Sequence, residues 1–326
     1  MKRTIVAALG AAAIIGLSTA GAFAQAYPTK QVTMIIPFAA GGPTDTVGRV
    51  LAEAMSKDLG QQIVIENVGG AGGTVGAARL ATAAKDGYTV LVHHIGIATG
   101  ATLYRKLPYD TLTAFDYVGM VTTAPMTLVA RKDMPANDLK GLIDYIKANP
   151  TKVTEAHAGI ASASHLCGVL FQTALGIKVT AVPYTGTGPA MTDLLGGHVD
   201  FMCDQTTNTT GQITANAIKA YAVTTPRRID ALPNLATAAE AGLPNFEIGV
   251  WHGLFVPKGT PLAVIDRLNA ALKKALVDPT VVMRFAALGT APSPAADVTP
   301  AALKAKVESE VARWKPILTA FGEFGD

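Results

Sequence analysis

Residues 34–45 read Met-Ile-Ile-Pro-Phe-Ala-Ala-Gly-Gly-Pro-Thr-Asp. The run begins like a buried strand, breaks at Pro37 and passes through two adjacent glycines. Residues 46–59 carry apolar side chains at helical spacing, which predicts a helix with Asp45 as its N-cap. A strand, a glycine loop and a helix N-terminus together form a concave surface of backbone N–H groups that favours an anion. An ordinary strand-to-helix turn is the alternative that this stretch leaves open.

Strands and helices alternate on both sides of this stretch. Strands are predicted at residues 31–36, 62–66 and 88–93, with helices between them, and a second alternating set extends from residue 152 to residue 224. This order predicts α/β domains, each a mainly parallel sheet flanked by helices. Extended segments near residues 122–128 and 247–253 connect the two sets as hinge crossings. We therefore expect residues 25–125 and 250–326 to form domain 1 and residues 126–249 to form domain 2.

The N-terminus has the pattern of a secretory signal. Met1-Lys2-Arg3 is followed by an apolar run and by Ala22-Phe23-Ala24, so residues 1–24 are predicted to be a signal peptide cleaved near Ala24, which places the protein in the periplasm. A retained membrane anchor is the rival interpretation. Without Lys2 and Arg3, 25 basic residues face 24 acidic ones, a net charge of +1. This balance gives no reason to expect a nucleic-acid partner.

Five loops are expected at the carboxyl ends of strands, where ligands bind in such sheets. They are residues 38–45, 94–100, 158–165, 185–189 and 204–208, and none of them contains lysine or arginine. A phosphate site normally recruits those side chains, whereas neutral donors and ordered water can bind a small carboxylate. Residues 184–191 repeat the order of strand, glycines and helix start. Two such turns facing each other would suit one carboxylate or the two ends of a diacid.

The histidines and cysteines allow several roles. His93 and His94 should point to opposite faces of their strand, so no metal site and no cofactor are expected. His94 and His165 fit either a pocket wall or an ordinary structural role. Cys167 and Cys203 can form one disulfide in an oxidising compartment, and two buried free thiols are the alternative.

The serines near His165 and the carboxylate of Asp204 suggest two further roles. Ser162 or Ser164 with His165 would suit a secreted hydrolase, although the G-x-S-x-G elbow is missing. Asp204 is interpreted either as a structural carboxylate or as the partner of an ammonium group on an amino-acid ligand.

Several longer motifs occur in one order along the chain. They are residues 37–45, residues 67–73 with Asp86-Gly87-Tyr88, residues 103–110, residues 183–190 and residues 256–261. With these motifs the chain resembles the Bug-type, TctC-like periplasmic solute receptors of tripartite tricarboxylate transporters. Residues 93–96, 163–168 and 202–207 are most similar to those of receptors for acidic amino acids or C4-dicarboxylates.

The resemblance implies a two-domain Venus-flytrap binding protein, type II-like, that is not an enzyme. It implies a monomer that delivers aspartate, malate or succinate to a membrane permease. The ligand-binding residues would be Phe38, Gly42, Pro43, Thr44 and Asp45 on one side, Thr185, Gly186 and Gly188 on the other, and Ser162, Ser164, His165 and Asp204 near the distal end. A receptor for an aromatic acid or a tricarboxylate, and a sensor subunit for signalling, are the alternatives within this architecture.

Overall fold

The computed structural model describes residues 27–322, 324 and 325. The predicted signal peptide lies outside them. Within the described residues, no helix is both long and apolar enough to cross a membrane.

A nine-stranded sheet runs through the molecule in the order β2-β1-β3-β9-β4-β7-β5-β6, with β8 paired to β4. The strands are β1 (Val32–Ile36), β2 (Ile63–Asn67), β3 (Thr89–His94), β4 (Phe115–Ala130), β5 (Thr154–His157), β6 (Thr180–Pro183), β7 (Phe201–Gln205), β8 (Lys219–Val223) and β9 (Gly249–Pro257).

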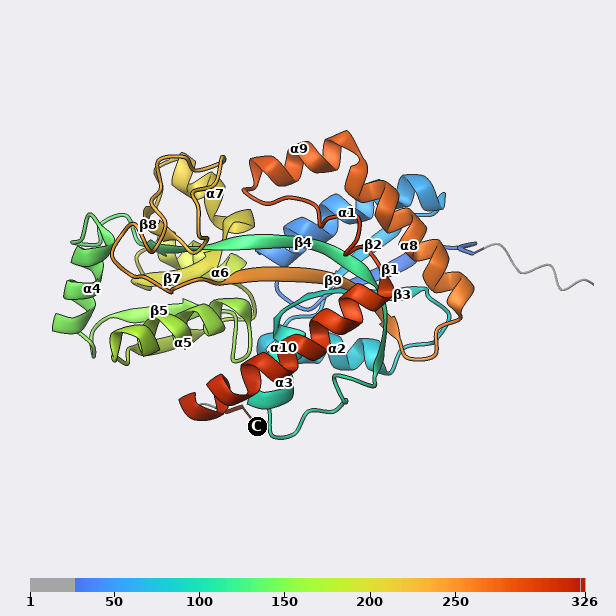
Figure 1. Ribbon diagram of the computed structural model, residues 1–326, viewed down its shortest axis with the longest axis horizontal. Helices are drawn as coiled ribbons and strands as arrows, with labels where there is room; N and C mark the ends of the chain where they lie inside the picture. Colours follow the sequence, from blue (N-terminus) through green and yellow to red (C-terminus); the bar gives the residue numbers. More distant parts are fainter. Residues whose placement is uncertain (1–26, 323, 326) are drawn as a thin grey trace, which may run out of the picture.

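Helices divide the sheet into two lobes, and the long strands β4 and β9 extend between them (Figure 1). Lobe 1 contains β1, β2, β3, β9 and the first part of β4, with α1 (Pro43–Leu59), η1 (Ala71–Gly73), α2 (Thr74–Ala81), α3 (Gly96–Leu103), α8 (Leu262–Val277), α9 (Pro279–Ala287) and α10 (Pro300–Phe321). Lobe 2 contains the remaining strands with α4 (Leu139–Ala148), α5 (Ala163–Leu175), α6 (Thr187–Leu195) and α7 (Thr206–Thr214). The two-domain α/β architecture is the predicted one.

The strand β4 belongs to both lobes. It pairs with β9 as far as Pro125 and with β7 from Met126 onward. The extended segment predicted near residues 122–128 is part of this single strand of 16 residues. The domain boundaries at residues 125/126 and 249/250 stay a prediction, and this change of partner coincides with the first of them.

The sheet contains both parallel and antiparallel pairs of strands. β1 pairs in parallel with β2 and β3, and β5 does so with β6 and β7. The crossing strands β4 and β9 are antiparallel to their neighbours. The sheet is therefore mixed, because the two strands that connect the lobes run in opposite directions.

The helix α3 was missed by the sequence pattern, which predicted a loop over residues 94–100. Gly96, Thr99 and Gly100 have low helical propensity. The helix is nevertheless buried along most of its length and packs against α10. Tertiary packing thus determines its conformation.

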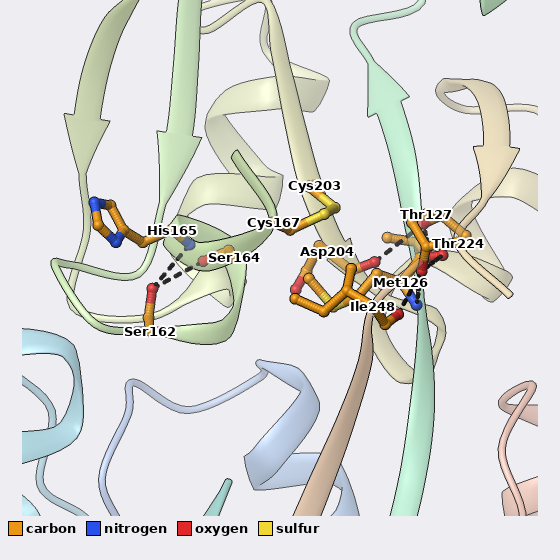
Figure 2. Close-up of a disulfide and its surroundings, with 11 residues drawn as sticks. Met126, Thr127, Ser162, Ser164, His165, Cys167, Cys203, Asp204, Thr224 and Ile248 are labelled. Carbon is orange, nitrogen blue, oxygen red and sulfur yellow. Dashed lines mark hydrogen bonds between the residues drawn. A yellow bond between two sulfur atoms is a disulfide. The ribbon is translucent and has the colours of Figure 1, made fainter. Parts of the chain in front are cut away.

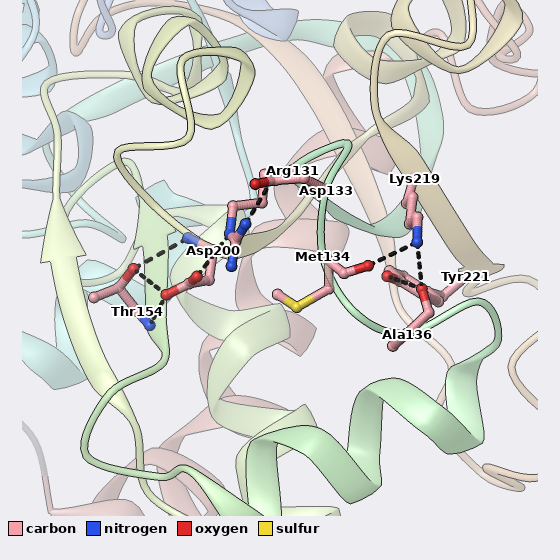
Figure 3. Close-up of polar contacts among 8 residues, drawn as sticks. All are labelled: Arg131, Asp133, Met134, Ala136, Thr154, Asp200, Lys219 and Tyr221. Atoms are coloured by element: carbon pink, nitrogen blue, oxygen red, sulfur yellow. Dashed lines mark hydrogen bonds and ion pairs between the residues drawn. The ribbon is translucent and has the colours of Figure 1, made fainter.

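The outer end of lobe 2 is held by polar contacts (Figure 3). The Asp200 carboxylate accepts hydrogen bonds from Arg131 Nε at 2.9 Å and from Thr154 N at 2.8 Å. Lys219 Nζ donates to the carbonyl oxygens of Met134 at 2.7 Å and Ala136 at 2.9 Å. These bonds connect β4, β5, β7 and β8 at the end of the lobe that lies away from the hinge.

Candidate functional site

The first turn of the site joins β1 to α1. The helix begins at Pro43, with Gly42 as its N-cap in extended conformation. The prediction that Asp45 is the N-cap is therefore wrong, because the helix starts at Pro43, three residues earlier than predicted, and the fixed φ of proline suits that position. Asp45 lies in the first turn of the helix.

The Asp45 carboxylate holds the preceding loop in shape. Its Oδ2 accepts from Gly41 N at 3.0 Å and from Arg49 Nε at 2.9 Å, and its Oδ1 accepts from Asn67 Nδ2 at 2.9 Å. Burial alone would raise the pKa of Asp45, but the hydrogen bonds from Arg49, Gly41 and Asn67 outweigh it and lower the pKa. Asp45 is not among the residues that line the cavity described below.

The second turn joins β6 to α6 and meets the first turn directly. Gly186 is the N-cap of α6, and Ala39 N donates a hydrogen bond to Thr185 O at 3.0 Å. A Cβ on Gly188 would lie 2.7 Å from Ala40 O, and one on Gly186 would lie 2.8 Å from Ala39 N. Only residues without side chains allow this approach. The lobes are therefore in contact, and the structure is a closed form.

A small cavity of about 10 Å³ lies between the lobes beside these turns. It is lined by Phe38, Pro43, Thr44, His94, Ala158, Ser162, Ala163, Ser164, Thr187, Asp204 and Gln205. Seven of the predicted site residues are in this set. Gly42, Thr185, Gly186 and Gly188 instead form the contact between the turns. No lysine or arginine belongs to the lining in the described part of the chain.

Aromatic and imidazole rings form the lobe 1 wall. Phe38 stacks on His94 with ring centroids 4.6 Å apart, and the centroids of the nearly perpendicular Phe38 and His93 rings lie 5.8 Å apart. Thr44 Oγ1 lies 3.3 Å from Nε2 of His252, a residue of β9. Burial lowers the pKa of His93 and His252 to about 3 and that of His94 well below its usual value. These rings are therefore neutral at physiological pH.

Both His93 and His94 contact Phe38, which the rule of alternating strand faces did not predict. His94 is the last residue of β3, and its Nδ1 accepts a hydrogen bond from Gly96 N at 2.9 Å. The alternation of side chains between the two faces of the sheet does not extend past the end of β3, so His94 can turn toward Phe38 on the same side as His93. Among the residues that the structure describes, no cluster of His, Cys, Asp and Glu is arranged to hold a metal ion.

Asp204 and Gln205 form part of the lobe 2 wall. They pair with Thr127 and Met126 of β4, so β7 ends two residues later than the sequence predicted. Asp204 Oδ1 accepts from Thr187 Oγ1 at 3.0 Å, and Oδ2 accepts from Asn208 Nδ2 at 2.6 Å. Burial raises the pKa of Asp204 to about 6, although these hydrogen bonds oppose the rise.

The start of α5 supplies the two serines. Ser162 Oγ accepts from His165 N at 3.2 Å and caps the helix, and it lies 3.1 Å from Ser164 Oγ. The His165 ring is directed away from Asp204 (Figure 2). It packs against His157, with ring centroids 5.0 Å apart, and lines a separate cavity beside Glu155. The structure thus does not bring His165 into the cavity between the lobes.

A disulfide joins two of the elements that carry site residues. Cys167 of α5 and Cys203 of β7 are bonded, with their Cα atoms 5.9 Å apart. Of the two alternatives drawn from the sequence, the structure has the disulfide. It connects the helix of Ser162 and Ser164 to the strand of Asp204 (Figure 2).

Four lining residues were not predicted: Ala158, Ala163, Thr187 and Gln205. All four lie within or beside loops that the sequence placed at the cleft. Nothing in the sequence distinguished Thr187 and Gln205 from their polar neighbours. Gln205 is the last residue of β7 and pairs with Met126 of β4. This pairing is a tertiary contact, so the local sequence does not reveal it.

Residues 47–322 match the family model of the tripartite tricarboxylate transporter family receptor, TctC. The chain belongs to this family. Its members are periplasmic binding proteins and not enzymes, so the hydrolase alternative is wrong.

Relatives of this TctC family chain extend over nearly all of it. A UPF0065 protein from the TAR-I ttuE-ttuC' intergenic region of Agrobacterium vitis is 52% identical over 92% of this chain and 86% of its own length. The solved structure of the periplasmic binding protein BugD is 47% identical with a TM-score of 0.90, covering 92% of this chain and all of that one. MatC from Rhodopseudomonas palustris with bound malate is 41% identical with a TM-score of 0.86, covering 89% and 99%.

Proposed function

We propose that this protein is a periplasmic receptor that captures a small carboxylate of the aspartate, malate or succinate type between its two lobes. It delivers the ligand to the permease of a tripartite tricarboxylate-type transporter. One observation carries this proposal: two turns of the same construction meet beside a cavity that, among the residues the structure describes, is lined by no cationic side chain.

Helix N-termini explain how neutral groups can bind an acid. The first N–H groups of α1 and α6 have no partners within their helices, and the helix dipole favours negative charge there. Gly42 and Gly188 bring the two helix starts together when the lobes close. Burial in a small cavity strengthens each hydrogen bond to the carboxylate. Malate bound to the 41% identical MatC is compatible with this ligand class.

The roles of the site residues follow from their places. Phe38, Pro43 and Thr44 form the lobe 1 side with His94, and Ser162, Ser164 and Asp204 form the lobe 2 side. Gly42, Thr185, Gly186 and Gly188 allow closure. Asp45 supports the first loop from behind. The mature chain begins near residue 25 and acts as a monomer whose domain 2 comprises residues 126–249.

Calorimetry on the mature chain, residues 25–326, tests the ligand class. Aspartate, malate and succinate are titrated alongside tricarboxylates and aromatic acids, with a neutral sugar as the control. At least one C4 acid should bind with a Kd of about 1 μM or below, which corresponds to roughly 8 kcal/mol. Bound ligand should also raise the melting temperature by mass action. No heat from any acid of the panel would disprove the proposal.

Transport is tested separately. Uptake of the identified acid into cells that contain the cognate permease should require this receptor. If uptake is unchanged in a receptor deletion while a signalling output disappears, the chain is a sensor subunit instead.

A further inference from the structure

The turn that precedes α5 has a strained backbone. Ser162 N donates to Gly159 O at 3.1 Å and closes a turn over residues 159–162. The third residue of this turn, Ala161, has a φ of +70°. These are features of a type II turn, which normally has glycine at its third position because the φ there is positive. Ala161 has a Cβ, so its backbone is strained in this conformation.

This turn carries part of the cavity wall. Ala158 and Ser162 flank and end it, and both line the cavity between the lobes. Ala158 N donates to Ser164 Oγ at 2.9 Å, and Ser162 Oγ lies 3.1 Å from Ser164 Oγ. The conformation of the turn therefore determines where the two serine hydroxyls lie.

Side chains of lobe 1 hold this turn of lobe 2. Thr99 Oγ1 of α3 donates to Ala161 O at 2.9 Å, and both residues are fully buried. Tyr104, the C-cap of the same helix, donates from its hydroxyl to Ile160 O at 3.1 Å. Gly72 of η1 packs against Ile160 O so closely that a Cβ would have no room. A strained conformation persists where its surroundings determine it in this way.

We infer that Thr99 and Tyr104 are positioning residues for ligand binding, which hold the turn at residues 159–162 in its strained form when the lobes close. The inference rests on the proposed function. Neither side chain lines the cavity. When the lobes separate, the bonds from lobe 1 are lost and no longer compensate the strain at Ala161, so the turn relaxes. The affinity for the ligand then depends on two side chains that do not contact it, because they stabilise the binding-competent form.

Thr99→Val and Tyr104→Phe each remove one of these bonds and keep the size of the side chain. Each should weaken the binding of aspartate, malate and succinate about three- to tenfold by calorimetry, as expected for the loss of one hydrogen bond. Thr99→Ser retains the donor and should bind as the wild type does. In Tyr104→Phe the melting temperature without ligand should change little, whereas a purely structural role of the hydroxyl would lower it.

Ala161→Gly should change the affinity in the opposite direction. Glycine adopts a positive φ at little cost, so this variant should bind about twofold more tightly or better. Combined with Tyr104→Phe, it should return the affinity toward that of the wild type.

Tyr221→Phe is the matched control. It removes a hydroxyl that donates to Ala136 O at 3.0 Å within lobe 2 (Figure 3), and it should leave the affinity unchanged. Circular dichroism establishes that each variant is folded, and Tyr104→Phe carries the test if Thr99→Val is not.

Two outcomes would overturn the inference while leaving the proposed function intact. One is wild-type affinity in both Thr99→Val and Tyr104→Phe. The other is that Ala161→Gly raises the melting temperature of the unliganded protein without changing the affinity, since the turn would then have the same conformation in the open and closed forms. If none of the three acids bound the wild-type protein, the proposed function would be disproved, and the inference with it.

Discussion

Gly188 determines how closely the lobes can approach each other. A methyl group there would lie 2.7 Å from Ala40 O and 3.0 Å from Gly42 N, and both are backbone atoms that cannot rotate away. The clash exists only in the closed form. A substitution should therefore act on closure and leave each lobe folded.

We expect Gly188→Ala to weaken ligand binding more than tenfold, or about 1.4 kcal/mol, with little change in the melting temperature of the unliganded protein. Calorimetry and thermal unfolding measure the two quantities. Gly211→Ala on α7 is the control, because a Cβ there meets no atom within 4 Å. Unchanged affinity in Gly188→Ala would show that binding does not require this contact.

At the residue level the sequence indicated cavity-lining residues correctly where the local order of strand, loop and helix determines their position. Phe38, Pro43 and Thr44 follow a strand and open a helix, and that local order is visible in the chain. The sequence-based prediction was wrong where the direction of a side chain determines whether the residue lines the cavity. Asp45 turns toward Asn67 of β2, and His165 packs on His157 of β5, and each of these partners comes from folding rather than from local spacing.

The disulfide is a property of two elements, α5 and β7. Its cysteines are separated by 36 positions, and a closed loop of that size lowers the entropy of the unfolded chain. Replacing both residues, Cys167→Ala with Cys203→Ala, should lower the free energy of unfolding by about 3–4 kcal/mol. Urea unfolding under oxidising conditions measures the loss. A difference below about 1 kcal/mol would show that packing between α5 and β7 suffices without the bond.

The boundaries of helices and strands are also determined partly by local sequence and partly by tertiary contacts. The helices α5 and α10 begin at caps that the local sequence supplies, because Ser162 Oγ accepts from His165 N and Thr299 Oγ1 accepts from Ala302 N. The hinge crossing predicted near residues 122–128 lies within β4 and includes Thr122, Thr123 and Pro125. Pairing with β9 extends the strand through them, and sequence periodicity contains no information about that partner.

The stability of the whole molecule should depend on pH through its buried imidazoles. The pKa values of His93 and His252 are lowered to about 3 in the folded state, so below pH 6.5 the unfolded chain binds protons that the folded chain does not. Stability then falls as pH falls, by up to about 1.4 kcal/mol per histidine and pH unit. Asp204 acts in the opposite direction between about pH 6 and 4, because its pKa is raised in the folded state.

The melting temperature should therefore decrease from pH 7.5 to pH 5, since His94 adds to the other two histidines and Asp204 is a single opposing group. Asp204→Asn should make the decrease steeper by removing that opposition. Thermal unfolding at intervals of half a pH unit provides the measurement. A flat profile for the wild-type protein would mean that the three imidazoles are hydrated or ionised when folded.

The position of β9 has a consequence for the order of assembly. Synthesis and export both deliver the chain from its N-terminus, and β9 is the central neighbour of β3 and β4 although it is the last strand to arrive. Most of lobe 2, with its Cys167–Cys203 bond, can form before β9 is available. Until then the edge of β3 that pairs with β9 has no partner, and the side chains of Val90, Leu91 and Val92, which are buried in the folded protein, are exposed. During biogenesis, the nascent lobe 1 is thus the part that is most in need of a holding chaperone.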